Sequence, residues 1–141
     1  MKTEPVAISI ILSDMVVCEQ GTGKNSLIGC FNNYNFVRFP SPPPPFFVTT
    51  ALTNLDPEFK EFDVTARIED PTNGIVLSSF GAHIQLRDPF VLTKDSVIEV
   101  PMVGMPFLFQ KPGNYHIIVL VNNSQAGKRN LTVSSVTAQA S

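Results

Sequence analysis

Tryptophan is absent from the sequence and charged residues are scarce, and both features narrow the class of protein. Tryptophan commonly anchors sugar-binding surfaces and the buried cores of antibody-type domains, so its absence makes both less expected. Charged residues account for only 16% of the chain, the net charge is -2, and neither sign forms a block. We therefore expect no general electrostatic affinity for nucleic acid or for an anionic membrane.

Long apolar runs are also missing. The apolar stretch at residues 6–12 is interrupted by Asp14, far short of the roughly 20 residues that cross a bilayer, and no small-residue cleavage site follows it. These features predict a cytoplasmic protein without a membrane segment.

Only two cysteines are present, Cys18 and Cys30, and their spacing matches no metal-binding or redox motif. In the cytoplasm we expect them to be free, partly buried thiols. They lie on either side of a predicted hairpin, so a disulfide between its strands remains open for an oxidising compartment. No cofactor is expected.

Short apolar segments, each closed by a turn signal, make up most of the chain. Hydrophobic residues account for 43% of its 141 residues, and no window of about 11 residues shows a helical period. The pattern predicts a single all-β domain over residues 1–141, a two-sheet antiparallel sandwich of 8–9 strands, with a loose tail at 137–141. The expected strands are residues 6–18, 27–31, 46–52, 62–69, 75–80, 83–87, 97–103, 115–121 and 128–136, with 32–39 extended and one helical turn near 56–61.

Four consecutive prolines, residues 42–45, cannot join the interior of a sheet because they donate no backbone hydrogen bonds. We expect a stiff polyproline crossover between strands, with the neighbouring phenylalanines in the domain's own core. The alternative is that this segment docks into an aromatic groove on a partner protein.

The segment 112–122, with Gly113 and Tyr115 before an apolar strand, is similar to the penultimate strand of immunoglobulin-like sandwiches. In those domains the tyrosine braces a corner through its hydroxyl. The segment 68–76, in which Asp70-Pro71 and Gly74 separate two strands, resembles a hairpin common in the same domains. This resemblance implies a fold and no activity.

The whole chain also resembles a family of small uncharacterised bacterial proteins of unknown function. The residues that carry this resemblance are Leu12-Ser13-Asp14, Gly23-Lys24, Ser26-Leu27-Ile28-Gly29, Phe39-Pro40 and Gly113-Asn114-Tyr115. It implies a compact standalone domain and says nothing about chemistry.

Residues 21–26 have some likeness to a phosphate-binding loop, but the match fails. Cys18 stands where the first glycine is required, Asn25 replaces the serine or threonine, and a strand follows in place of a helix. The segment is predicted to be a glycine-rich hairpin turn.

The only histidines, His83 and His116, show no ligand spacing, and a catalytic or metal role would require them to meet carboxylates such as Asp88. The sequence has no nucleophile elbow, and the adjacent pair Glu69-Asp70 is expected to be solvated at a turn. We therefore predict no catalytic, cofactor-binding or metal-binding residue.

Asp14 interrupts an apolar strand face. If that face is buried, the carboxylate needs a partner, for which Arg38 and Arg67 are the candidates. The favoured alternative is a bulge or strand break at Ser13-Asp14 that turns the carboxylate to solvent or to backbone amides.

The run 115–121, from Tyr115 to Val121, is apolar on both faces. It is predicted to be a central strand or a strand at a subunit contact, and we expect a homo-oligomer formed through it. The alternative is a loop covering its outer face.

Together these patterns predict a non-catalytic binding or assembly module with a protein partner. A domain that binds a small ligand or carbohydrate in an end cleft is the alternative, followed by an enzyme of unfamiliar type.

Overall fold

Nine β-strands form two sheets in the computed structural model, which describes residues 4–88 and 90–137. The strands are β1 Val6–Cys18, β2 Asn25–Phe31, β3 Asn33–Phe36, β4 Phe47–Thr53, β5 Glu61–Asp70, β6 Ile75–Gln85, β7 Ile98–Val103, β8 Gly113–Val121 and β9 Ser124–Ser135. The described residues include no helix, and therefore none that is long and apolar enough to span a membrane. The predicted tail falls, apart from residue 137, outside the described residues.

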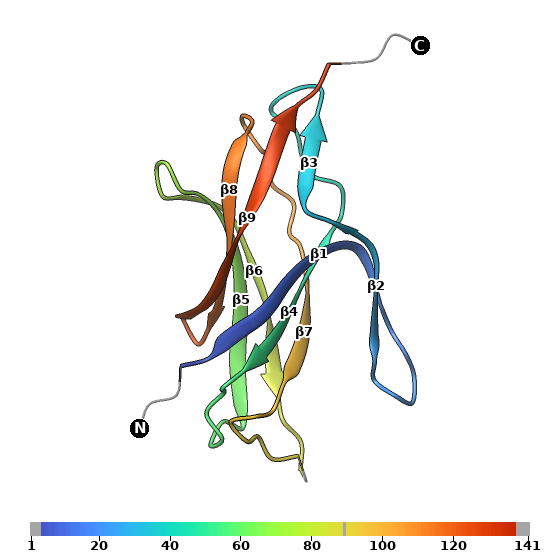
Figure 1. Cartoon of the computed structure of the whole chain (residues 1–141), viewed down its shortest axis with the longest axis vertical. Helices are drawn as coiled ribbons and strands as arrows, with labels where there is room; N and C mark the ends of the chain where they lie inside the picture. The colour runs from blue at the N-terminus through green and yellow to red at the C-terminus, as the bar shows by residue number, and fades with distance from the viewer. Residues whose placement is uncertain (1–3, 89, 138–141) are drawn as a thin grey trace.

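One sheet has the order β2-β1-β4-β7 and the other the order β3-β9-β8-β5-β6. Both run along the long axis of the molecule, and the β2 end of the first sheet stands off to one side (Figure 1). The prediction of an all-β, two-sheet fold is confirmed, but the prediction that it is entirely antiparallel is wrong. β3 pairs in parallel with β9. Only Asn32 separates β2 from β3, so the chain leaves the first sheet without a turn and enters the second sheet still running in the direction of β2.

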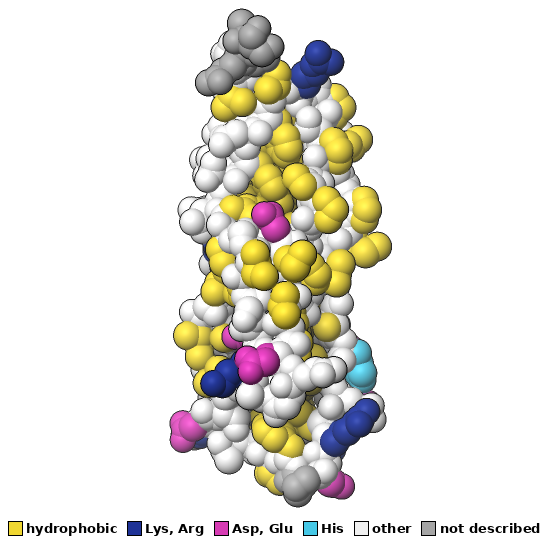
Figure 2. Space-filling view, turned by 90° about the vertical axis from the view of Figure 1, so that its right-hand side faces the viewer, with side chains coloured by type: hydrophobic (Ala, Val, Ile, Leu, Met, Phe, Trp, Pro, Cys, Tyr) yellow, Lys and Arg dark blue, Asp and Glu magenta, His cyan; other side chains and the backbone are white. Residues whose placement is uncertain are grey.

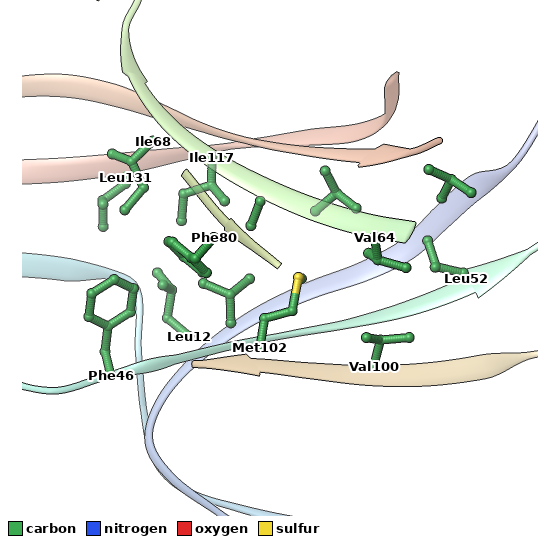
Figure 3. Close-up of a cluster of buried hydrophobic side chains, with 14 of the residues drawn as sticks. Leu12, Phe46, Leu52, Val64, Ile68, Phe80, Val100, Met102, Ile117 and Leu131 are labelled. Atoms are coloured by element: carbon green, nitrogen blue, oxygen red, sulfur yellow. The ribbon is translucent and has the colours of Figure 1, made fainter. Parts of the chain in front are cut away.

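The strand that alternates most regularly in the sequence, β5, shows why these segments fold as they do. Its apolar residues Phe62, Val64, Ala66 and Ile68 are at most 1% exposed, while the polar residues between them are exposed or half-buried. Side chains from the two sheets meet in a single core (Figure 3). The first sheet contributes Leu12, Val48, Leu52, Val100 and Met102, and the second contributes Val64, Ile68, Phe80, Ile117 and Leu131.

The structure also decides the predictions for the segments around β6, residues 56–61 and the prolines. The two strands expected at 75–80 and 83–87 are one strand, β6, because Gly81 continues the ladder opposite Thr65. The expected helical turn is a hydrogen-bonded turn closed by Phe59 N–H and the Asp56 carbonyl. Residues 42–45 cross from β3 in one sheet to β4 in the other, as the stiff-crossover interpretation predicts.

The sheets are held together at one side by a close approach of β9 to β1. Arg129 on β9 donates from Nη1 to the carbonyl oxygen of Ile10 at 2.8 Å and from Nη2 to Oδ1 of Asn32 at 2.8 Å. Gly127 allows this approach, because a Cβ there would lie 2.7 Å from the Cβ of Ala7. A glycine at such a position marks backbone proximity rather than flexibility.

Candidate binding surface on the β1–β2 arm

The hairpin of β1 and β2 extends beyond the body of the first sheet, and we call residues 14–29 the arm. Its strands pair in unbroken register, with Met15 opposite Ile28 and Cys18 opposite Asn25. The tip is closed by a bond from Glu19 N–H to the Lys24 carbonyl at 2.7 Å. The glycine-rich segment is therefore a hairpin turn, as predicted.

One face of the arm is apolar and uncovered. Met15, Val17 and Ile28 are 52%, 44% and 50% exposed. Met15 and Ile28 are paired and Val17 lies two residues along the strand, so all three side chains project to the same face. Figure 2 views the molecule from the side on which β2 lies in Figure 1, and hydrophobic side chains gather in a band on it. A contiguous apolar surface of this kind is typical of interaction sites.

Asp14 lies at the base of the arm and is exposed, so the predicted turn of this carboxylate toward solvent is confirmed. It forms no ion pair with Arg38 or Arg67 among the described residues. The predicted bulge or strand break at Ser13-Asp14 is wrong, because β1 continues through these two residues and its register with β2 does not shift there. Room for the carboxylate comes instead from the partner strand: Gly29 has a φ of 71°, and a Cβ on it would collide with the Asp14 carboxylate.

A cleft of about 770 Å³ lies between the tip of the arm and the loop that precedes β7. The side-chain amide of Asn25 donates to Oε1 of Glu99 at 2.8 Å and ties the tip to β7. Lys24, Arg87 and Phe90 also line the cleft, and Phe90 is 50% exposed. The cleft thus combines an exposed aromatic ring with two cations and the Glu99 carboxylate. Sequence reasoning did not identify it because its walls are far apart in the chain.

The apolar run Tyr115 to Val121 forms most of β8, which is bonded to β5 and β9 and is therefore a central strand, one of the two predicted alternatives. Its outward side chains Ile118 and Leu120 are only 5% and 8% exposed. Ile118 lies between Arg67 and Lys128 in the ladder, and such long side chains can cover an apolar neighbour with their aliphatic stems. This strand therefore offers a partner little apolar area, which counts against it as the predicted subunit contact.

The histidines lie on separate strands, β6 and β8. His83 does contact carboxylates: its Nδ1 lies 2.7 Å from Oδ1 of Asp63 and its Nε2 lies 3.3 Å from Oε2 of Glu61. The hydrogen bond to Asp63, followed by the one to Glu61, raises the pKa of His83 above its ordinary value of 6.5. All three side chains are more than half exposed, and among the described residues no group of His, Cys, Asp and Glu is placed to hold a metal ion.

The expectation that Glu69 and Asp70 are a solvated pair is wrong for Asp70, which is only 7% exposed. Its Oδ1 accepts bonds from the Thr72 hydroxyl at 2.6 Å and the Thr72 N–H at 3.0 Å. These two bonds, together with Lys111 nearby, lower the pKa of Asp70. The carboxylate therefore caps its turn, and burial at this position is not readable from the local sequence.

The cysteines are free, as predicted, but both are exposed rather than partly buried. Cys18 faces Asn25 and Cys30 faces Ser13, so they lie five residue pairs apart along the β1–β2 ladder. At roughly 3.4 Å per residue this separation is about 17 Å, well beyond the span of a disulfide. The disulfide between the two strands is therefore excluded in this fold.

A sequence model of a family of unknown function (DUF6941) matches residues 8–134. A search of curated proteins found no match. Among solved structures, one similar chain is the Pseudomonas fluorescens alkylpurine DNA glycosylase AlkC bound to DNA containing an abasic site analog. It is 14% identical, with a TM-score of 0.43, and the match covers 73% of this chain and 28% of the glycosylase chain. A likeness this weak carries no argument about function.

Proposed function

The chain belongs to DUF6941, a family of unknown function, and we propose that it is a non-catalytic binding or assembly module whose contact surface is the apolar face of the arm. The observation that carries this proposal is the half-exposed set Met15, Val17 and Ile28 on one face of a two-stranded extension. Leaving these side chains in water forgoes the hydrophobic stabilisation that burial against a partner supplies.

The proposal includes an immunoglobulin-like sandwich as the scaffold. Its support is the hydroxyl of Tyr115, which donates to the carbonyl oxygen of Lys111 at 2.6 Å, four residues upstream, as in the corner contact of those domains. It also includes a bacterial, cytoplasmic setting, where two exposed free thiols stay reduced.

The test is site-specific photo-crosslinking in cells that produce the protein. A photoreactive residue replaces Val17 on the arm, and the matched control places it at Val76 on β6, since both valines are 44% exposed. We expect a higher-mass adduct from position 17 and none from position 76. Equal adducts from both positions, or none from position 17, would contradict the proposal.

A second candidate function is the binding of a small ligand or carbohydrate in the cleft beside the arm. The observation that favours it is Phe90, an exposed aromatic ring in a concave surface flanked by Lys24 and Arg87. The two cations outnumber the one carboxylate of the lining, Glu99, and favour sugars that carry a carboxylate or phosphate over neutral ones.

Amide chemical shifts recorded during titration with neutral and anionic monosaccharides check this candidate. Shifts confined to the cleft residues, and lost in Phe90→Ala, would support it. Unchanged cleft amides at millimolar concentrations of every sugar would remove it.

A further inference from the structure

We propose that the partner of the arm is a second copy of this chain, bound by antiparallel pairing of β2 with β2 of the partner subunit about a two-fold axis at Ile28. This inference rests on the proposed function and names its partner. It follows from three features of β2: its free edge, its lack of charge and the apolar row that it carries.

β2 is an edge strand: among the described residues its backbone pairs only with β1, and Figure 1 shows no strand beyond it. The side chain of Asn25 at its first residue is bonded to Glu99 of β7, and this contact leaves the backbone edge free. An edge strand presents unpaired N–H and C=O groups that another strand can satisfy. Natural edges are usually protected by charge, proline or shortness, yet Asn25–Phe31 contains no charged residue and no proline. The edge strand at the other end of this sheet, β7, carries both Glu99 and Pro101.

The edges of the second sheet suit self-pairing less well. β3 has only four residues. β6 carries His83, which contacts Glu61 and Asp63, and pairing of two β6 strands would bring both acidic clusters to one interface. Its Ser78 hydroxyl also donates to the Met105 carbonyl, 3.5 Å away, in the segment after β7.

Centring the pairing on Ile28 makes the apolar surface continuous. Met15 is paired with Ile28 within one arm, so a two-fold axis at Ile28 aligns Met15 and Ile28 with Ile28 and Met15 of the partner subunit in a single row. Directly opposed apolar side chains on neighbouring strands are the unit that stabilises such a ladder. Because the axis makes the contact self-complementary, a second copy satisfies it without any other protein.

No charged side chain enters the apolar row, and the backbone has to change at one residue of β2, Gly29. Asp14 is the neighbour of Met15 in the strand and projects to the other face of the arm, so it does not enter the apolar row. Gly29 has a positive φ, but glycine also occupies the extended region readily and can adopt it when β2 gains a second partner.

Sedimentation equilibrium of the full chain over a hundredfold range of concentration tests the proposal. We expect a monomer–dimer equilibrium, and we expect Ile28→Lys to be monomeric throughout because two lysines would face each other at the axis. The matched control is Ile75→Lys on β6, where isoleucine is 59% exposed against 50% for Ile28, and it should dimerise as the native chain does. Circular dichroism checks that both variants fold.

Disulfide trapping supplies a second measurement that does not depend on weakening the arm. In a C18S/C30S background, Ile28→Cys should form a disulfide-linked dimer on oxidation, because opposed residues of antiparallel strands have Cα atoms roughly 4.5–5.5 Å apart. Ile75→Cys in the same background should not. A native chain that stays monomeric, a dimer unaffected by Ile28→Lys, or no crosslink at position 28 would overturn the proposal.

These outcomes are separable from the fate of the proposed function. A photo-adduct from Val17 that contains a different protein, with a monomeric native chain, would retain the binding module and overturn self-pairing. An adduct that contains two copies of this chain would support both.

Discussion

Tyr115 is the residue at which a local motif and its tertiary contact agree. The ring is 2% exposed, and its hydroxyl reaches the Lys111 carbonyl at the corner before β8. The sequence indicated this contact through the spacing of Gly113 and Tyr115, because the bond is local in the chain.

Removing this hydroxyl should weaken the fold measurably. Tyr115→Phe removes the hydrogen bond that the buried Tyr115 side chain donates to the Lys111 carbonyl, and we expect a loss of about 1 kcal/mol in the free energy of unfolding, measured in urea. Tyr34→Phe is the matched control, because the buried Tyr34 hydroxyl has no partner among the described residues, and burial together with the charge of Asp14 raises the pKa of its phenol. Tyr34→Phe should be neutral or stabilising, and an equal loss in both variants would contradict this account.

His83 gives the molecule a pH-dependent contact on β5 and β6. Since its pKa is raised in the folded state, its contribution to stability is fully present below pH 6.5 and is lost as the pH rises through the raised pKa. NMR titration of the imidazole should give a midpoint above 6.5 that returns toward 6.5 in Asp63→Asn. An unchanged midpoint in that variant would mean that Asp63 does not cause the shift.

At the scale of elements, the close approach of β9 to β1 depends on the absence of a side chain at Gly127. Gly127→Ala would place its Cβ against that of Ala7, and we expect it to reduce the free energy of unfolding by about 1–3 kcal/mol. The double variant Ala7→Gly with Gly127→Ala moves the methyl group from one strand to the other and should recover part of that loss. Additive losses in a urea double-mutant cycle would show that the two positions are not in steric contact.

The arm shows what an element can hide from sequence reasoning. Its pairing and its turn follow from local pattern, and both were predicted. The exposure of its apolar face was not predicted. Met15, Val17 and Ile28 are residue types typical of a core, and the local sequence does not show that these strands extend beyond the body of the sheet. The glycine that admits Asp14 was missed for a related reason, since the two residues meet only across the hairpin.

Across the whole molecule, strands differ in how well their backbone is covered. β8 has a partner on each side and buried side chains on both faces, whereas β2 has one partner and exposed side chains. In hydrogen exchange at a concentration that favours monomer, amides of β8 should be the slowest and those of β2 should exchange orders of magnitude faster. Equal protection in the two strands would mean that the arm and the core open as one unit.

The sequence by itself determined those features that depend on residues close to one another in the chain. This includes the all-β class, the alternation of β5, the proline crossover and the corner at Tyr115, because strand periodicity and turn chemistry act over a few residues. Tertiary structure alone decided the parallel pairing of β3 with β9, the burial of Asp70 and of the outward side of β8, and the exposure of the arm. Each of these depends on which distant segment of the chain lies alongside. An apolar residue looks the same in the sequence whether a neighbouring strand buries it or it stays exposed for a partner.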